Sequence, residues 1–164
     1  MIYTPDDYNQ YDVLNVPMSF TLATIYMLKH FIIFTLPMVA QTMPAVVKFA
    51  HAHVSVTLMI VSIPAILVLF ASLRRTPYAG KIPRWLWKNA KILLFSSVFL
   101  EISIIVSFAL LNIKQFDAAS LLFLYIDSII VLYLWRSKRL KDVLAEFPVP
   151  EREKLAKTIN DRLM

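Results

Sequence analysis

The chain of 164 residues is 59% hydrophobic and only 17% charged, and its mean hydropathy is +0.64. This composition excludes a soluble domain of this size and predicts an integral membrane protein. The absence of cysteine excludes disulfides and thiolate metal sites, and the net charge of +6 sits mainly beside the ends of apolar segments, where it serves topology rather than nucleic-acid binding.

Four apolar stretches are long enough to cross a hydrocarbon layer of about 30 Å as helices. A polar segment, residues 1–17, precedes them and carries acids but no Lys or Arg, so we expect no cleavable signal peptide. Pro64 predicts a kink in the second stretch, and Pro37 predicts a bend near the end of the first. The sequence predicts an all-α, four-helix transmembrane bundle over residues 18–136, with spans at about 18–41, 54–73, 90–112 and 116–135.

Basic residues in the connections indicate the orientation, since loops rich in Lys and Arg stay on the cytoplasmic side. The first and third connections hold one lysine each, Lys48 and Lys114. The second holds six basic residues and no acid, and the tail after the last span adds a further cluster. With four spans, both termini are therefore predicted to be cytoplasmic. The basic residues are Arg74, Arg75, Lys81, Arg84, Lys88 and Lys91 in the second connection, and Arg136, Lys138, Arg139 and Lys141 in the tail.

Aromatic and basic side chains of the second connection are typical of a belt at the cytoplasmic interface of a membrane. We expect them to anchor the bundle in the headgroup layer. The predicted interface anchors are Tyr78, Trp85, Trp87, Arg74, Arg75 and Lys88.

Residues 137–164 form a mixed-charge tail with two short helical patterns separated by Pro148 and Pro150. Both patterns predict a cytoplasmic amphipathic tail. The first would lie on the membrane surface as a continuation of the fourth helix. The second would bind a partner, lie on the surface or end as a frayed terminus. The apolar stripes are Leu140, Val143, Leu144 and Phe147 in the first pattern, and Leu155, Ile159 and Leu163 in the second.

Three ionisable side chains lie near the middle of separate spans: Lys29, Glu101 and Asp127. A charge at the bilayer centre costs about 2.5–3.5 kcal/mol or more, so each needs a partner, a protonation change or a water-lined cavity. Helix rise places all three within about 5 Å of one level, where they could meet around one axis. We also count Ser97 and His30 in this mid-membrane polar cluster. Ser97 shares the face of Glu101 at i−4, whereas His30 points about 100° away from Lys29 and could face another neighbour.

This polar cluster has three interpretations. Two carboxylates beside one ammonium would leave one acid protonated, which suits a proton or cation relay. Alternatively, Lys29 pairs with Glu101 or Asp127 and locks three helices in register, which we favour, or the charges face a partner protein. Broken helices or internal repeats, which carriers usually show, are not visible in the sequence.

The remaining polar residues provide no catalytic or metal-binding motif. His51 and His53 flank Ala52, a spacing that suits neither one helical face nor a closed metal site, and His30 lies about 15 Å from their level. We therefore expect no metal and no cofactor, haem included, and no enzymatic activity.

The run Asp7-Tyr8-Asn9-Gln10-Tyr11-Asp12-Val13-Leu14-Asn15-Val16-Pro17 resembles the opening of an uncharacterised family of small bacterial inner-membrane proteins typified by YfeZ. Tyr8, Leu14 and Pro17 fit the pattern of that family, whereas Asp12 stands at its glycine position and Asn15 at its lysine position. A second run, Pro83-Arg84-Trp85-Leu86-Trp87-Lys88, is similar to the basic, Trp-containing middle loop of the family. The resemblance implies a bacterial inner membrane and supplies no activity.

These observations predict a small non-enzymatic protein of the bacterial inner membrane, an accessory or structural subunit of a larger membrane assembly. Its partners would be the lipid bilayer and a membrane protein or further copies of itself, and no nucleic acid. The alternative is an oligomeric proton- or ion-conducting protein that uses Lys29, Glu101 and Asp127.

Overall fold

The computed structural model describes residues 3–111, 113 and 117–150, and this part of the chain is helical apart from turns and one isolated bridge between Tyr8 and Leu14. Lys114, the start of the predicted fourth span and the tail pattern containing Leu155 lie outside the described residues. A 3₁₀ turn, η1 (Pro5–Asp7), precedes the α-helices. These are α1 (Met18–Tyr26), α2 (Lys29–Val39), α3 (Pro44–His53), α4 (Val56–Val61), α5 (Ile63–Leu73), α6 (Lys81–Lys88), α7 (Ala90–Leu110), α8 (Ala118–Arg136) and α9 (Lys138–Ala145).

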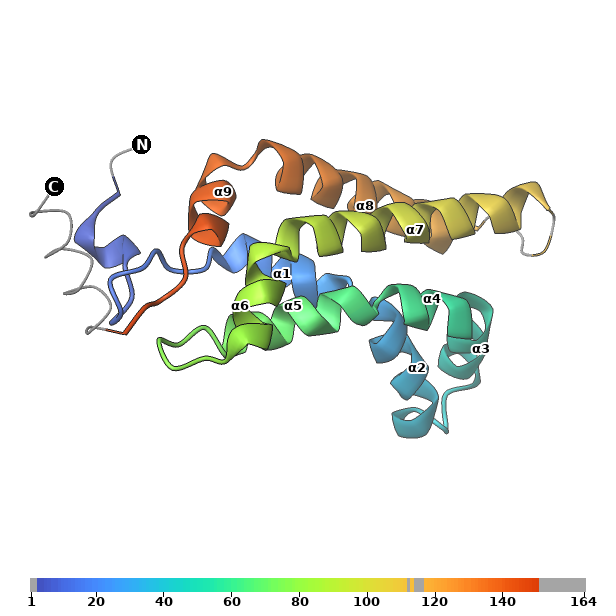
Figure 1. Ribbon diagram of the computed structural model, residues 1–164. Helices are drawn as coiled ribbons and strands as arrows, with labels where there is room; N and C mark the ends of the chain where they lie inside the picture. The colour runs from blue at the N-terminus through green and yellow to red at the C-terminus, as the bar shows by residue number, and fades with distance from the viewer. Residues whose placement is uncertain (1–2, 112, 114–116, 151–164) are drawn as a thin grey trace, which may run out of the picture.

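Helices α7 and α8 pack side by side as the longest hairpin of the molecule (Figure 1). Each is long and apolar enough to cross a membrane, and so is the combined segment Val56–Leu73. The bent pair α1 and α2 would supply a fourth crossing if it counts as one span. The described residues are thus all-helical, as predicted, and they carry three to four membrane-length segments where the sequence predicted four spans.

The first predicted span, residues 18–41, is not one straight helix. Helices α1 and α2 meet at an angle of 61°, and the break lies at Met27 and Leu28 rather than at Pro37. Leu28 donates its N–H to the carbonyl of Ile25, a tighter i−3 bond that ends the α-helical ladder. The large bend of the first predicted span therefore lies before Pro37 in the chain, and Pro37 itself stays inside α2 close to its end at Val39.

The second predicted span begins later than expected. Residues 44–53 form the separate helix α3, which packs against α2, and residues 54 and 55 are extended before Ser55 caps α4 through the N–H of Leu58. The kink predicted at Pro64 is present as the break between α4 and α5 at Ser62, with proline in the first turn of α5.

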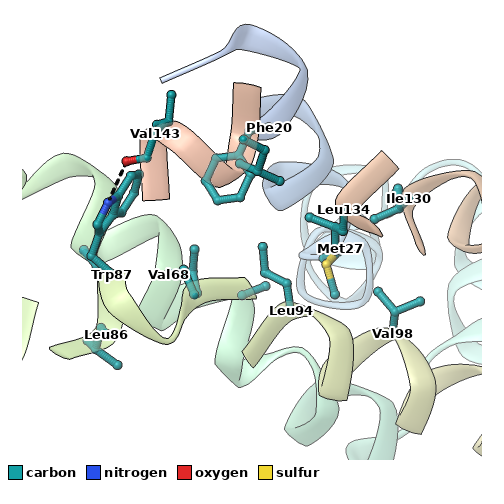
Figure 2. Close-up of a cluster of buried hydrophobic side chains, with 14 of the residues drawn as sticks. Phe20, Met27, Val68, Leu86, Trp87, Leu94, Val98, Ile130, Leu134 and Val143 are labelled. Atoms are coloured by element: carbon teal, nitrogen blue, oxygen red, sulfur yellow. Dashed lines mark hydrogen bonds between the residues drawn. The ribbon is translucent and has the colours of Figure 1, made fainter. Parts of the chain in front are cut away.

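The apolar core is continuous from the N-terminal helix to the tail. Trp87 from α6 meets Phe20 from α1 edge-to-face, with ring centroids 6.0 Å apart, and Val68, Leu94 and Leu134 pack beside them (Figure 2). Helix α9 joins the same core because Leu140 and Val143 are fully buried. The tail helix therefore packs on the bundle through its apolar side, and a break at Ser137 separates it from α8.

The N-terminal segment and the end of α9 are tied together at one end of the molecule (Figure 1). Buried Arg75 makes this junction by donating to the carbonyls of Leu14, Val143 and Glu146 at 2.6, 3.3 and 3.0 Å. The carboxylate of Glu146 accepts the N–H of Leu14 at 2.9 Å. One guanidinium thus donates to three backbone carbonyls, and two of them, those of Val143 and Glu146, also accept the indole N–H of Trp87.

Two side-chain contacts extend this junction to α9. Arg139 pairs with Asp7 at 2.7 Å, and Tyr3 donates to Asp142. Asp12, at the position where the resembled family has glycine, adopts a φ of 57°, the left-handed region that glycine enters without steric cost. The N-terminal run is thus a folded element of the structure, and its turn at Asp12 has a left-handed geometry that favours glycine.

Candidate functional site

The structure brings the three mid-span charges into direct contact. Lys29 Nζ lies 2.5 Å from Glu101 Oε1 and 3.0 Å from Asp127 Oδ1. These side chains come from the start of α2, the middle of α7 and the middle of α8, and all are buried, with exposed fractions of 6%, 1% and 0% for the three residues. We call Lys29, His30, Glu101 and Asp127 the polar cluster.

His30 joins the cluster, although helical spacing placed it on another face. Its Nε2 lies 2.8 Å from Glu101 Oε1, the oxygen that also binds Lys29. His30 thus lies in the polar cluster in which the sequence placed it, and it reaches Glu101 from the first turn of α2, which starts at Lys29 after the 61° break. At the end of a bent helix, two consecutive long side chains can reach one acceptor from different directions.

Aromatic rings shield the ammonium from solvent. Lys29 Nζ lies 4.3 Å from the centroid of the Tyr26 ring and 5.6 Å from that of the Phe123 ring. The Tyr26 hydroxyl donates to the Phe123 carbonyl at 3.4 Å, which joins α1 to α8. Sequence reasoning missed both rings because aromatic residues are common throughout the spans.

Charge balance limits what the cluster can do. Lys29 offsets one of the two carboxylates, so the group is neutral only if His30 is protonated or one acid holds a proton. Among the described residues, His30 Nδ1 and Asp127 Oδ2 are buried without a hydrogen-bond partner. Buried polar atoms without partners are costly, and here they mark the two ends of a chain of contacts that runs from His30 through Glu101 and Lys29 to Asp127.

Ser97 does not belong to the cluster. Its hydroxyl donates to the carbonyl of Val61 at 2.5 Å, at the break between α4 and α5. That carbonyl lacks its usual helical donor because Ala65 donates to Ser62 instead. Ser97 therefore satisfies a backbone group exposed by the kink, a role that the spacing to Glu101 did not reveal.

The predicted interface anchors divide into two groups. Tyr78 and Trp85 are 89% and 60% exposed, and Arg74 and Lys88 are also exposed, as anchors should be. Trp87 and Arg75 are 1% and 6% exposed, and both hydrogen-bond to backbone carbonyls in the junction with α9. Their prediction as anchors was wrong, because the tail folds back and covers them.

A histidine–carboxylate pair lies at the end of the molecule opposite the junction between the N-terminal segment and α9. His53 Nε2 approaches Asp117 Oδ2 at 2.8 Å, while His53 Nδ1 meets the carbonyl of Phe49. Asp117 caps α8 by accepting the N–H of Ser120, and this bond holds the pKa of its carboxyl below the ordinary value. His51, in contrast, lines a cavity of about 360 Å³ between α2, α3 and α4. Within the described residues no three His, Asp or Glu side chains gather as a metal site.

Comparison with known proteins gives a family and no activity. A family model described as a protein of unknown function, DUF2919, matches residues 3–146, which include the junction, the polar cluster and α9. No curated protein and no solved structure matches the chain. The expectation of an uncharacterised family is thus confirmed.

Proposed function

Because the chain belongs to the DUF2919 family of proteins of unknown function, we propose its role from its geometry: a non-enzymatic, four-span protein of the bacterial inner membrane that serves as a structural or accessory subunit of a larger assembly. The polar cluster is the observation that carries this proposal. Its charged side chains bind one another between the helices, and such contacts would fix the register of α2, α7 and α8.

The surfaces of the spans support a membrane position with contacts to lipid or to another subunit. Only 17% of the apolar window of α8 is buried, and the corresponding share for α7 is 28%. Large apolar side chains such as Phe99, Leu122 and Tyr125 are more than half exposed. A chain of this size leaves most of its span surface to be covered by something else.

The basic end of the molecule supports an orientation with both termini in the cytoplasm. Arg75 and Arg139 tie the N-terminal segment to α9. These two segments therefore lie at the same end of the molecule as the basic connection between α5 and α7. The positive-inside rule assigns that end to the cytoplasm. The chain has no native cysteine, so single cysteines at Tyr78 and Lys48 can be probed with a membrane-impermeant maleimide. Labelling of the Lys48 position alone in intact spheroplasts supports the orientation, and labelling of the Tyr78 position alone contradicts it.

Native mass spectrometry of the mildly extracted protein tests the accessory role. We expect a stoichiometric complex with a membrane protein or with further copies, and a weaker complex for Glu101→Gln, whose cluster no longer holds the helices in register. Asp6→Asn is a matched control, since it makes the same acid-to-amide change at an exposed position outside the spans. A monomer without stoichiometric partners under all mild extraction conditions would contradict the proposal.

Proton or ion conduction is the second candidate, because the contacts from His30 to Asp127 form one continuous chain with an unpartnered polar atom at each end. A proton could move along such a chain only if its ends reach water in some state of the protein. Flux into vesicles that contain the purified protein, lost in Asp127→Asn while the assembly stays intact, would favour conduction over the accessory role.

A further inference from the structure

A groove of about 590 Å³ lies where α6, the beginning of α7 and α9 meet. One part of its lining is basic and contains no acidic residue; the other part is apolar and includes Trp87 and Phe147. The basic side chains come from the consecutive helices α6 and α7 and from α9, which is distant from both in the sequence. They are Arg84, Lys88, Lys91 and Lys141.

A second groove, of about 420 Å³, lies on the other side of α9 and shares Lys141 with the first. Arg136 and Lys138 supply its charge, and Leu132 and Trp135 supply its apolar wall. The positive charge therefore continues across α9 and lies beside apolar side chains of α8 on one side and of α6 and α9 on the other.

The main groove is held in shape by the junction with the tail. Arg84 donates to the carbonyls of Pro77 and Ala79 at 2.7 and 3.2 Å, and its guanidinium carbon lies 5.2 Å from the centroid of the Phe147 ring. The indole N–H of Trp87 is engaged by the carbonyls of Val143 and Glu146 (Figure 2 shows the bond to Val143). The Trp87 ring therefore forms an apolar wall of the groove, because its polar N–H is bonded elsewhere. The Arg84 guanidinium is held in place by its hydrogen bonds to two backbone carbonyls.

We propose that this groove binds the headgroup of an anionic phospholipid, with the phosphate among Arg84, Lys88, Lys91 and Lys141 and the upper part of the acyl chains against the apolar wall. This inference rests on the proposed membrane position, which brings the start of α7 to the headgroup layer. Charge complementarity and the mixed lining favour a lipid over nucleic acid, which would need a basic surface without a neighbouring membrane-length apolar face.

Native mass spectrometry of the full chain in a neutral detergent tests the proposal by titration with phosphatidylglycerol and, separately, with phosphatidylcholine. We expect preferential binding of phosphatidylglycerol. The double variant Lys88→Gln, Lys141→Gln should weaken that binding roughly thirtyfold, since each lysine near an anionic headgroup contributes about fivefold. The matched control Arg74→Gln, Lys81→Gln removes the same charge from exposed positions outside the groove, and we expect it to change affinity by less than about threefold.

Three results would overturn the proposal. Wild-type protein could bind both lipids equally, the control pair could lose as much affinity as the groove pair, or soluble glycerol phosphate could displace the lipid, which would identify a free phosphate ester as the ligand. The wild-type comparison needs no variant, so it stands even if a substitution impairs folding. Retention of the protein in phosphatidylcholine vesicles after a carbonate wash tests the membrane position separately from the lipid preference.

Discussion

Replacing Lys29 by methionine tests whether the polar cluster holds the helices in register. Within the part of the chain that the structure describes, Lys29 is the only ion-pair partner of Asp127, and it shares Glu101 with His30. The change therefore leaves a carboxylate of 0% exposure without its cation. Breaking a buried ion pair by removing one partner costs about 3–5 kcal/mol, because an uncompensated charge remains in the interior. Methionine is about as long as lysine but is apolar and uncharged, so little of this cost would come from lost side-chain volume.

The magnitude can be checked against two further variants. The pair Lys29→Met, Asp127→Asn should recover at least about 1–2 kcal/mol relative to Lys29→Met alone, since the neutral amide leaves no unpaired charge at that position. Arg139→Gln removes the surface pair with Asp7, whose side chains are 41% and 24% exposed, and should cost only about 0–1 kcal/mol.

The assay is reversible unfolding of the purified protein in mixed micelles of increasing SDS content, followed by far-UV circular dichroism. A cost below about 1 kcal/mol for Lys29→Met, equal to that of the surface control, would refute a structural role for the cluster. A double variant no more stable than the single one would show that the charge of Asp127 is not what destabilises the protein.

Three further changes test the junction, a helix cap and the left-handed turn. Arg75→Lys cannot reach three carbonyls with one ammonium, so we expect a loss of about 1–3 kcal/mol in the same SDS assay and faster amide exchange in α9; unchanged exchange would contradict the junction. Asp117→Ala removes the cap of α8 and should cost about 1 kcal/mol, whereas Asp117→Asn keeps the cap. Because the pKa of Asp117 is lowered in the folded protein, its ionisation stabilises the fold above its ordinary pKa of 3.8, and this contribution is lost as the pH falls through the lowered value; melting curves between pH 3 and 7 should show the loss in wild type and not in Asp117→Asn. Asp12→Val should cost about 1–2 kcal/mol and Asp12→Gly less, since only glycine enters the left-handed region freely; equal melting temperatures for the two variants would contradict the turn.

Hydropathy and length were sufficient to identify the long helices, because a membrane-length segment needs about 20 apolar residues and little else resembles it. The α7–α8 hairpin lies close to residues 90–112 and 116–135, as expected within the described residues. Helix rise also predicted that Lys29, Glu101 and Asp127 share one level, a condition for their contact.

The same local rules failed wherever a distant segment decided the outcome. Trp87 and Arg75 match the pattern of interface anchors, but the tail covers both and supplies the carbonyls of Val143 and Glu146. The break before Lys29 contains no proline or glycine, so no local signal predicted it. Ser97 shares a helical face with Glu101, yet it binds a carbonyl that only the kink in a neighbouring segment makes available.

The sequence by itself therefore determined that the described chain is helical, that it carries several membrane-length segments and that the buried charges share one level, since these depend on composition and on the fixed rise of a helix. Only the tertiary structure decided which charges meet, that His30 joins Lys29 at Glu101, and that the N-terminal segment and α9 close over one end. Pairing depends on the rotation and bending of each helix about its axis, and packing between segments far apart in the chain sets both.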